Sequence, residues 1–425
     1  MSPDHDLPPV AARFLRYVQI DTQSNPDSDS IPTTEKQKDL SRLLAEELRE
    51  MGVEDAEMDE HGYVYATVPA AGPAADRPAE SAPTLALVAH VDTSPDEPGG
   101  PVKPRVHRSY DGSVVELGGD PPVRLDPERS PGLLDHLGHD LITGDGTTLL
   151  GSDDKAGVAV IMQLAEDLVN DPSLPRPRLR LCFTVDEEVG RGIDALDLDR
   201  LGADAAYTLD GGPVGELDTE TFNAATATVR VQGVNVHPGK ARGVMANAVR
   251  ILAEILAALP ADQSPEATDG TEGYFFPHRI ADGASPVAAE AQILLRDFEA
   301  DGLARRKRFV EHLVEAARAA HPRATIELEI EDSYRNMKSY IAETDPRTIE
   351  LAFAAAEAMG LELTEQRIRG GTDGARLSEE GLPTPNIFTG GHDFHSRFEW
   401  NTVQNLETTL AYVKRLMAHW AEQGD

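Results

Sequence analysis

The sequence predicts an α/β protein that is interrupted by a smaller α+β unit. In the first half, short apolar strands alternate with amphipathic helices, and several of those strands end in acidic residues. After residue 220, the pattern changes to strands with period-two alternation. Alternating strands and helices indicate a parallel sheet, whose ligand sites lie at the carboxyl ends of the strands. At roughly 150 residues per domain, 425 residues predict two or three domains.

The first clear helix spans residues 34–52. Leu40, Leu44 and Leu48 fall on one helical face, and Gly52 supplies a stop signal. The segments that follow are predicted as strands at 63–68 and 84–89, a surface loop at 69–83, and short hairpins and loops at 94–141.

The middle of the chain continues the α/β pattern. A helix is predicted at 156–169, and apolar strands at 179–185 and 205–209. Both strands run into acidic residues, which places carboxylates at one edge of the predicted sheet.

The inserted unit carries the order strand, helix, strand, helix, strand, typical of a two-layer α+β sandwich. Its predicted elements are strands at 224–232, 288–296 and 324–330 and helices at 245–259 and 302–320. Two further helices, at 345–359 and 406–421, return the chain to α/β character. The predicted domains are 1–220, 221–333 and 334–425, the first and last forming one domain.

Composition limits the classes of partner. With 39 Lys+Arg against 74 Asp+Glu, the net charge of −35 disfavours nucleic acid and anionic membranes and favours cations. The single cysteine, Cys182, cannot form an intramolecular disulfide, and the first ten residues show no basic and apolar leader pattern. We therefore expect a cytoplasmic protein.

Several segments place acids or histidines at the ends of apolar strands. His90 and Asp92 lie on the same side of a strand, although such a pair is common by chance. Asp153 precedes a helix, where capping explains one acid but not two consecutive ones. Three acids at 186–188 are either solvated or held by a multivalent cation.

Two further segments complete a mixed histidine and carboxylate set. Asp210 ends a strand before two glycines, and His395 lies far downstream. This chemistry suits Zn²⁺ and, less strongly, Mn²⁺ or Co²⁺. The candidate ligands are His90, Asp153, Glu188, Asp210 and His395.

The chain resembles the M20 metallopeptidases, and within them the tripeptide aminopeptidases. The segments that carry the resemblance are HVDTSPD at 90–96, TLLGSDDKAGVA at 148–159, FTVDEEVGRG at 183–192, YTLDGGPVGELDTETFNAA at 207–225, NVHPGKARGVMANA at 235–248, RGGTDGARLS at 369–378 and PNIFTGGHDFHSRFEW at 385–400. The resemblance implies a zinc-exopeptidase-like catalytic domain with the smaller unit inserted as a lid. It also implies hydrolysis of the first peptide bond of tripeptides.

The resemblance assigns roles to the catalytic-domain residues. Asp153 would bridge two zinc ions, with His90 and Asp210 on one and Glu188 and His395 on the other. Glu187 would act as the general base, and Asp92 would orient His90. A cis peptide is expected between Asp153 and Asp154.

His392 and His395 compete for the last ligand role. The family pattern is a histidine followed four residues later by a glutamate, which His395 and Glu399 satisfy. We therefore expect His392 to be a solvated loop residue near the mouth of the site.

In the lid, the resemblance implies a set of residues that reach the substrate. His237 would stabilise the oxyanion, with Asn235 and Asn247 beside it, although His237 before a proline alone indicates only a turn. Arg296 is a candidate for binding the peptide carboxylate and Arg369 a second one, against the alternative of structural ion pairs. Lid closure implies a hinge near residues 220 and 334.

Other functions remain open at this point. The same site could act on dipeptides, on N-acyl amino acids or at the C-terminus of a peptide. A non-catalytic peptide-binding or metal-binding relative is a further alternative, which predicts the loss of Glu187 or of a ligand, and all are present. A homodimer is possible, since some relatives dimerise through the lid.

Overall fold

The computed structural model describes residues 7–77 and 83–423 and divides into two compact units. The first unit takes in the chain up to Thr219, Ser339–Gln366 and the chain from Thr372 onward. The second comprises Glu220–Lys338 and Arg367–Gly371. Residues 1–6, within the ten N-terminal residues that show no leader pattern, lie outside the described residues, as do residues 78–82 of the predicted loop.

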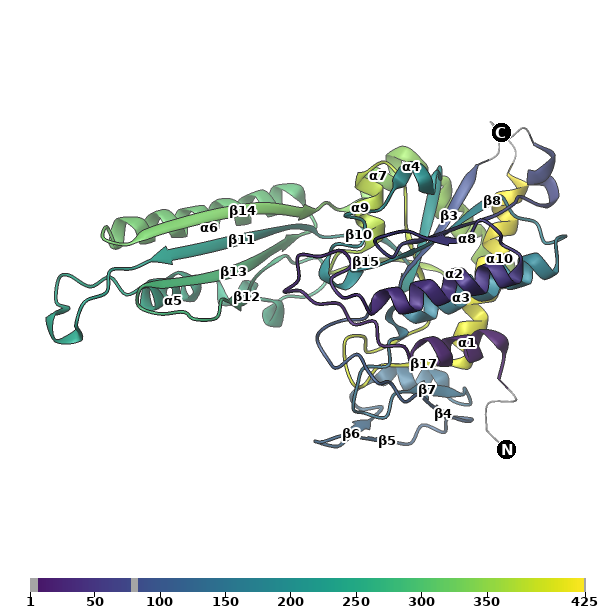
Figure 1. Cartoon of the computed structure of the whole chain (residues 1–425), viewed down its shortest axis with the longest axis horizontal. Coiled ribbons are helices and arrows are strands. Elements are labelled where there is room, and N and C mark those ends of the chain that lie inside the picture. Colours follow the sequence, from purple (N-terminus) through teal and green to yellow (C-terminus); the bar gives the residue numbers. More distant parts are fainter. Residues whose placement is uncertain (1–6, 78–82, 424–425) are drawn as a thin grey trace. The chain divides into compact units, whose positions relative to one another are not determined.

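The first unit is built on an eight-stranded sheet (Figure 1). Its strand order is β1 (Glu57–Met58), β2 (Val64–Val68), β8 (Arg178–Thr184), β3 (Thr84–His90), β9 (Ala205–Gly211), β16 (Asn386–Phe388), β10 (Glu216–Thr221) and β15 (Thr364–Ile368). The four central strands β8, β3, β9 and β16 are parallel, whereas β2 and β10 flank them in antiparallel pairs. The predicted parallel sheet is therefore confirmed for the strands that matter to the site.

Helices cover this sheet because its central strands are apolar on both faces. In β3 and β8, every residue after the first is buried. The helices that pack here are α1 (Pro9–Tyr17), α2 (Gln37–Met51), α3 (Ser152–Asn170), α8 (Arg347–Met359) and α10 (Val403–Glu422). Gly52 ends α2 in the left-handed conformation, at φ 104°, and its N–H bonds to the last turn, as the sequence predicts.

The second unit is a two-layer sandwich, as predicted. Its antiparallel sheet has the order β12 (Tyr274–Ile280), β13 (Ala288–Asp297), β11 (Asn223–Gln232) and β14 (Thr325–Tyr334). Helices α5 (Ala248–Ala257) and α6 (Ala300–Ala320) contact both central strands and each other, and together they enclose a separate apolar core (Figure 1). Strand β12 is an addition to the predicted elements.

The region predicted as short hairpins and loops, 94–141, contributes strands to two small sheets. One has the order β17 (Trp400–Thr402), β7 (Leu141–Thr143) and β4 (Arg105–His107), and the other pairs β5 (Val115–Gly118) with β6 (Val123–Leu125). Trp400 is fully buried in the apolar cluster of this region. The sheet joins the loop around residue 400 to the first half of the chain.

The remaining elements are short. They are η2 (Gly72–Asp76), within the segment predicted as a loop, η3 (Pro131–His136), η4 (Glu187–Val189), α4 (Leu198–Leu201), η5 (Pro238–Lys240), η6 (Ala261–Gln263), η7 (Pro265–Ala267), α7 (Met337–Thr344) and α9 (Asp373–Glu379). Among residues 7–77 and 83–423, no helix has both the length and the apolar character needed to cross a bilayer.

Asp218 on β10 carries a buried carboxylate whose effect on stability can be measured. Its side chain is buried and accepts a hydrogen bond from the Asn386 amide at 3.0 Å, and burial raises its pKa to about 7. Because the folded state disfavours the ionised form, Asp218 costs stability as the pH rises from its unfolded pKa of about 4 to about 7. Asp218→Asn keeps an acceptor for Asn386 and removes that cost.

We therefore expect the gain in unfolding free energy of Asp218→Asn over wild type to grow with pH, from little at pH 4 to about 1 to 3 kcal/mol at pH 7. Urea unfolding at several pH values measures the difference, and the exposed Asp262→Asn controls for the loss of one surface charge. A difference between Asp218→Asn and wild type that does not change with pH would show that the Asp218 carboxylate is not desolvated.

Candidate metal centre

The predicted ligands gather at one edge of the main sheet because four neighbouring parallel strands end there. His90 is the last residue of β3, and Asp210 lies near the end of β9. Glu187 and Glu188 begin η4, directly after β8. The loop that follows β16 carries His395. Carboxyl ends of parallel strands meet at the same edge, so residues distant in sequence are brought together.

Asp153 lies between the two histidines. It sits at the start of α3, and the peptide bond between Asp153 and Asp154 is cis, as the resemblance implies. One carboxylate oxygen of Asp153, Oδ1, is 3.0 Å from His90 Nε2, and the other, Oδ2, is 3.2 Å from His395 Nε2. A single carboxylate therefore faces two separate imidazoles.

Each histidine also faces a second acid. Asp210 Oδ1 lies 3.5 Å from His90 Nε2, and Glu188 Oε2 lies 2.9 Å from His395 Nε2. The structure thus brings together all five predicted ligands, as two His–carboxylate pairs that share Asp153. This is the arrangement that two ions bridged by one carboxylate require.

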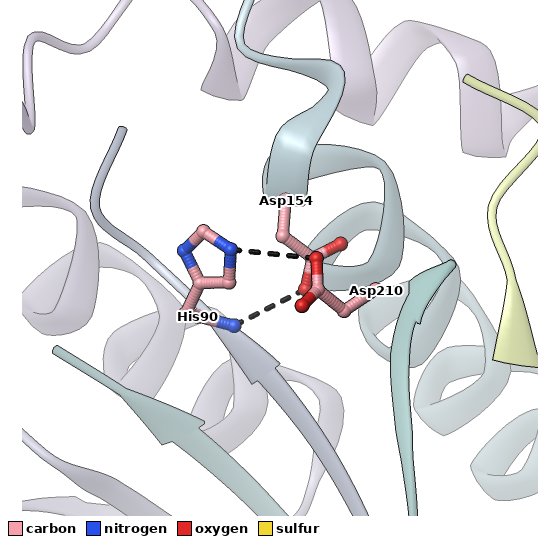
Figure 2. Close-up of side chains that lie close together, drawn as sticks. All are labelled: His90, Asp154 and Asp210. Carbon is pink, nitrogen blue, oxygen red and sulfur yellow. Dashed lines mark hydrogen bonds and ion pairs between the residues drawn. The ribbon is translucent and has the colours of Figure 1, made fainter. Parts of the chain in front are cut away.

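Asp154 is a rival to Asp153, since its carboxylate also lies near His90 and Asp210. In Figure 2, the His90 ring points toward Asp210, while the backbone N–H of His90 points toward Asp154. Asp154 accepts that N–H at 3.2 Å and the N–H of Gly157 at 3.1 Å. Both oxygens of Asp154 thus accept backbone donors, whereas the two oxygens of Asp153 face two imidazoles.

The electrostatics of the site show an excess of negative charge. Burial raises the pKa of Glu188 to about 7, and the charge of Asp153 adds to the shift. Burial, together with Asp153, also raises the pKa of Asp210 well above its ordinary value. For Asp153, burial acts in the same sense, but hydrogen bonds from His395 and His90 outweigh it and lower its pKa. Divalent cations would offset this repulsion.

The donor set fits a metal. Two imidazoles and three carboxylates are ligands that Zn²⁺ accepts, with Mn²⁺ and Co²⁺ as related choices. In addition, Glu188 Oε1 is buried and has no hydrogen-bond partner among the residues that the structure describes. A buried carboxylate oxygen without a donor is costly unless a cation contacts it. The residues gathered here are therefore able to hold a metal ion.

Asp92 supports the centre in two ways. Its backbone carbonyl oxygen lies 3.1 Å and its Oδ1 3.3 Å from Nδ1 of His90, so the residue predicted to orient His90 does contact its ring. Its two oxygens also accept the backbone N–H groups of Glu187, at 3.1 Å, and Glu188, at 3.2 Å. This second contact was not predicted, because it joins segments that only the fold brings together.

The contacts of two further acids near the site were not predicted from the sequence. Asp96 Oδ2 lies 3.2 Å from Nδ1 of His395, so it faces this histidine as Asp92 faces His90. Asp186 has a left-handed φ of 60°, and its carboxylate accepts the backbone N–H and hydroxyl of Thr33 and the amide of Gln37. The one available signal was the position of Asp96, four residues after Asp92 in the same motif.

The expectation that His392 is solvated is wrong. Its ring stacks on the indole of Trp400, with centroids 3.9 Å apart and planes 3° apart. Its Nε2 is buried and makes no hydrogen bond to any described residue. Burial and the nearby His136 lower the pKa of His392 to about 3, so the ring is neutral. His392 is shielded from solvent because it packs against the buried Trp400.

The predicted lid residues belong to the second unit. Asn235 and His237 are exposed, and His237 Nδ1 accepts the backbone N–H of Gly239 at 3.2 Å. Asn247 caps helix α5, because its side chain accepts the N–H of Arg250 at 3.2 Å. The cap explains why α5 begins at Ala248 rather than three residues earlier.

The two candidate arginines differ in how their donors are used. Toward the residues that the structure describes, Arg296 donates only from Nη1, to the carbonyl oxygens of Ala225 and Leu295. Arg369 uses Nη1 and Nη2 together, on the carbonyl oxygens of Gly270 and Glu272 and on the hydroxyl of Thr268. Arg369 therefore holds the loop at 268–272, whereas Arg296 keeps Nη2 and Nε for another acceptor.

Comparison with known proteins supplies relatives over nearly the whole chain. Residues 219–325 match the model of a peptidase dimerisation domain. Peptidase T of Bacillus cereus strain Q1 is 41% identical over 411 residues, which cover 97% of this chain and 98% of the relative.

Solved structures share the fold. The aminopeptidase PepT from Bacillus cereus ATCC 10987 has a TM-score of 0.71 at 21% identity and covers 97% of this chain and 98% of its own. A protein of Bacillus subtilis, described as a dinuclear metal-binding peptidase of the M20 family, has a TM-score of 0.61 at 14% identity, with 96% of each chain covered.

Substitution of the two adjacent aspartates tests which one binds metal. We expect Asp153→Asn to lose divalent cation on dialysis, because the bridging carboxylate is gone, and Asp154→Asn to retain it. Metal content measured by mass spectrometry after loading with Zn²⁺ distinguishes the variants. Retention by Asp153→Asn together with loss by Asp154→Asn would reverse the assignment.

Proposed function

The chain belongs to the peptidase T family of M20 metallopeptidases, and from that premise we propose that it is a dizinc aminopeptidase that releases the N-terminal residue of tripeptides. One observation carries the proposal: the Asp153 carboxylate faces both His90 and His395, and each histidine faces a further acid. Hydrolysis of an unactivated peptide bond is chemistry that such a centre performs.

We propose two Zn²⁺ ions per chain, with Mn²⁺ or Co²⁺ as alternatives. His90 and Asp210 would hold one ion, His395 and Glu188 the other, and Asp153 both. When bound, such ions act as Lewis acids on the scissile carbonyl and lower the pKa of a water molecule. The orphaned Oε1 of Glu188 and the excess of buried carboxylates support this assignment.

Glu187 is proposed as the general base. It neighbours a ligand glutamate, and the carboxylate of Asp92 fixes its backbone N–H. Burial raises the pKa of Glu187 well above its ordinary value, which suits a group that must accept and then release a proton. Glu187 would take the proton of the attacking water and deliver it to the leaving amine.

Residues of the second unit are proposed to bind the peptide. His237 would donate to the oxyanion, and Asn235 and Asn247 would bind the substrate. For the C-terminal carboxylate we favour Arg296 over Arg369, because Arg369 already donates from both terminal nitrogens. Arg369 stays in the proposal as the second candidate.

The proposal extends to location and assembly. A cytoplasmic setting is supported by Cys182, a free and buried thiol. A homodimer is supported by the match of residues 219–325 to a peptidase dimerisation domain.

A peptide panel tests the reaction. We expect release of the N-terminal residue from tripeptides in the presence of Zn²⁺, and a loss of about 10²- to 10⁴-fold in kcat for Glu187→Ala, because proton transfer is removed. Chromatography of the products after reaction with di-, tri- and tetrapeptides identifies the bond that is cleaved.

Equal turnover by wild type and Glu187→Ala would contradict the role of Glu187. Preferred cleavage of dipeptides, or release of the C-terminal residue, would contradict the proposed substrate and direct attention to the dipeptidase, carboxypeptidase or N-acyl amino acid hydrolase alternatives. A protein that binds Zn²⁺ but cleaves no peptide would support a non-catalytic relative.

Arg296 is tested with matched peptides that end in a carboxylate or an amide. Wild type should prefer the carboxylate, and Arg296→Ala should lose about 10-fold or more in kcat/KM for that peptide while changing little with the amide, because only the ion pair is lost. Arg369→Ala is the matched control. Loss of the preference in Arg369→Ala alone would transfer the role to Arg369.

A further inference from the structure

Glu399 is a buried carboxylate whose two oxygens both accept backbone hydrogen bonds. Its Oε2 accepts the N–H groups of Leu150 and Gly151, each at 2.8 Å. Its Oε1 accepts the N–H of Asp153 at 3.0 Å. The residue is 2% exposed, so these bonds are protected from water. Glu399 therefore fixes the backbone of the turn that leads into Asp153, the proposed bridging residue.

The same loop also reaches the side chain of that aspartate. His395, four residues before Glu399, places Nε2 at 3.2 Å from Asp153 Oδ2. One short stretch of chain thus contacts Asp153 twice, through the imidazole of His395 on its side chain and through the carboxylate of Glu399 on its backbone. The spacing between Asp153 and His395 is set within this stretch.

The loop at 392–400 is closed on itself, so that fixing Glu399 also limits the movement of His395. The backbones of His392 and Trp400 exchange hydrogen bonds of 2.9 and 3.1 Å, and their rings stack. His395 adopts a left-handed φ of 57° inside this closed segment. Without a fixed partner for the end of the loop, the imidazole would be free to move relative to Asp153.

We propose that Glu399 is a positioning residue that holds Asp153 and His395 at the separation which metal binding needs. The inference rests on the proposed metal centre. Charge-assisted hydrogen bonds to three backbone donors fix an orientation that neutral contacts would leave loose. Groups that orient metal ligands commonly account for about 10- to 100-fold in metal affinity.

The test is metal affinity in Glu399→Gln. The amide keeps one acceptor oxygen and places an NH₂ group against backbone N–H donors, so the variant loses at least one of the three bonds. We expect its Kd for Zn²⁺, from competition with a chromogenic chelator, to rise by about 10-fold or more over wild type. Glu399→Asp keeps the charge but is one methylene shorter, so its Kd should lie between those of wild type and Glu399→Gln.

Glu47→Gln is the matched control, because Glu47 is another buried carboxylate, which accepts hydrogen bonds from Tyr17 and Arg13. It should lower the unfolding temperature without changing Zn²⁺ affinity. If Glu399→Gln does not fold, the Kd of Glu399→Asp decides alone, and an unchanged value would overturn the proposal.

Different results would contradict the role of Glu399 and the proposed metal centre on which it rests. Wild-type affinity in Glu399→Gln, with only its unfolding temperature lowered, would overturn the positioning role and leave the metal centre in place. A loss of affinity no larger than that of Glu47→Gln would overturn it as well. A wild-type protein that binds no Zn²⁺ would overturn the proposed function first, and the inference with it.

Discussion

The Asp153 carboxylate lies between two imidazoles, and the placement of the other site residues depends on that contact. Four neighbouring parallel strands, β8, β3, β9 and β16, end at one edge of the sheet and deliver acids and histidines around this aspartate. Burying so many carboxylates together is costly, in line with the raised pKa values of Glu188 and Asp210. Bound divalent cations would offset this repulsion.

Support for the site comes from two segments that are built alike. His90, a proposed ligand, is followed by Asp92, which contacts its ring and fixes the turn after β8. His395, also a proposed ligand, is followed by Glu399, which fixes the turn before α3. In each case a buried acid joins the segment of one ligand to the backbone of another. The geometry of the centre is therefore a property of several loops acting together.

The sequence predicts most of the fold because apolar periodicity and strand-end acids are local signals. Helix α2 and strands β3 and β8 appear where the pattern places them. The double contact of Asp92, the approach of Asp96 to His395 and the backbone bonds of Asp154 escape prediction, because each joins segments that are distant in sequence. The prediction for His392 was wrong because its ring stacks on Trp400, within the same loop, and contacts His136, which is distant in sequence.

The most direct test of the central claim is the anomalous diffraction of crystals grown with Zn²⁺. Two peaks about 3.5 to 4 Å apart are expected, one on each side of the Asp153 carboxylate. One peak should lie within bonding distance of His90 and Asp210, and the other within bonding distance of His395 and Glu188. A single peak, or a pair joined by Asp154 rather than by Asp153, would contradict a bridged two-metal centre.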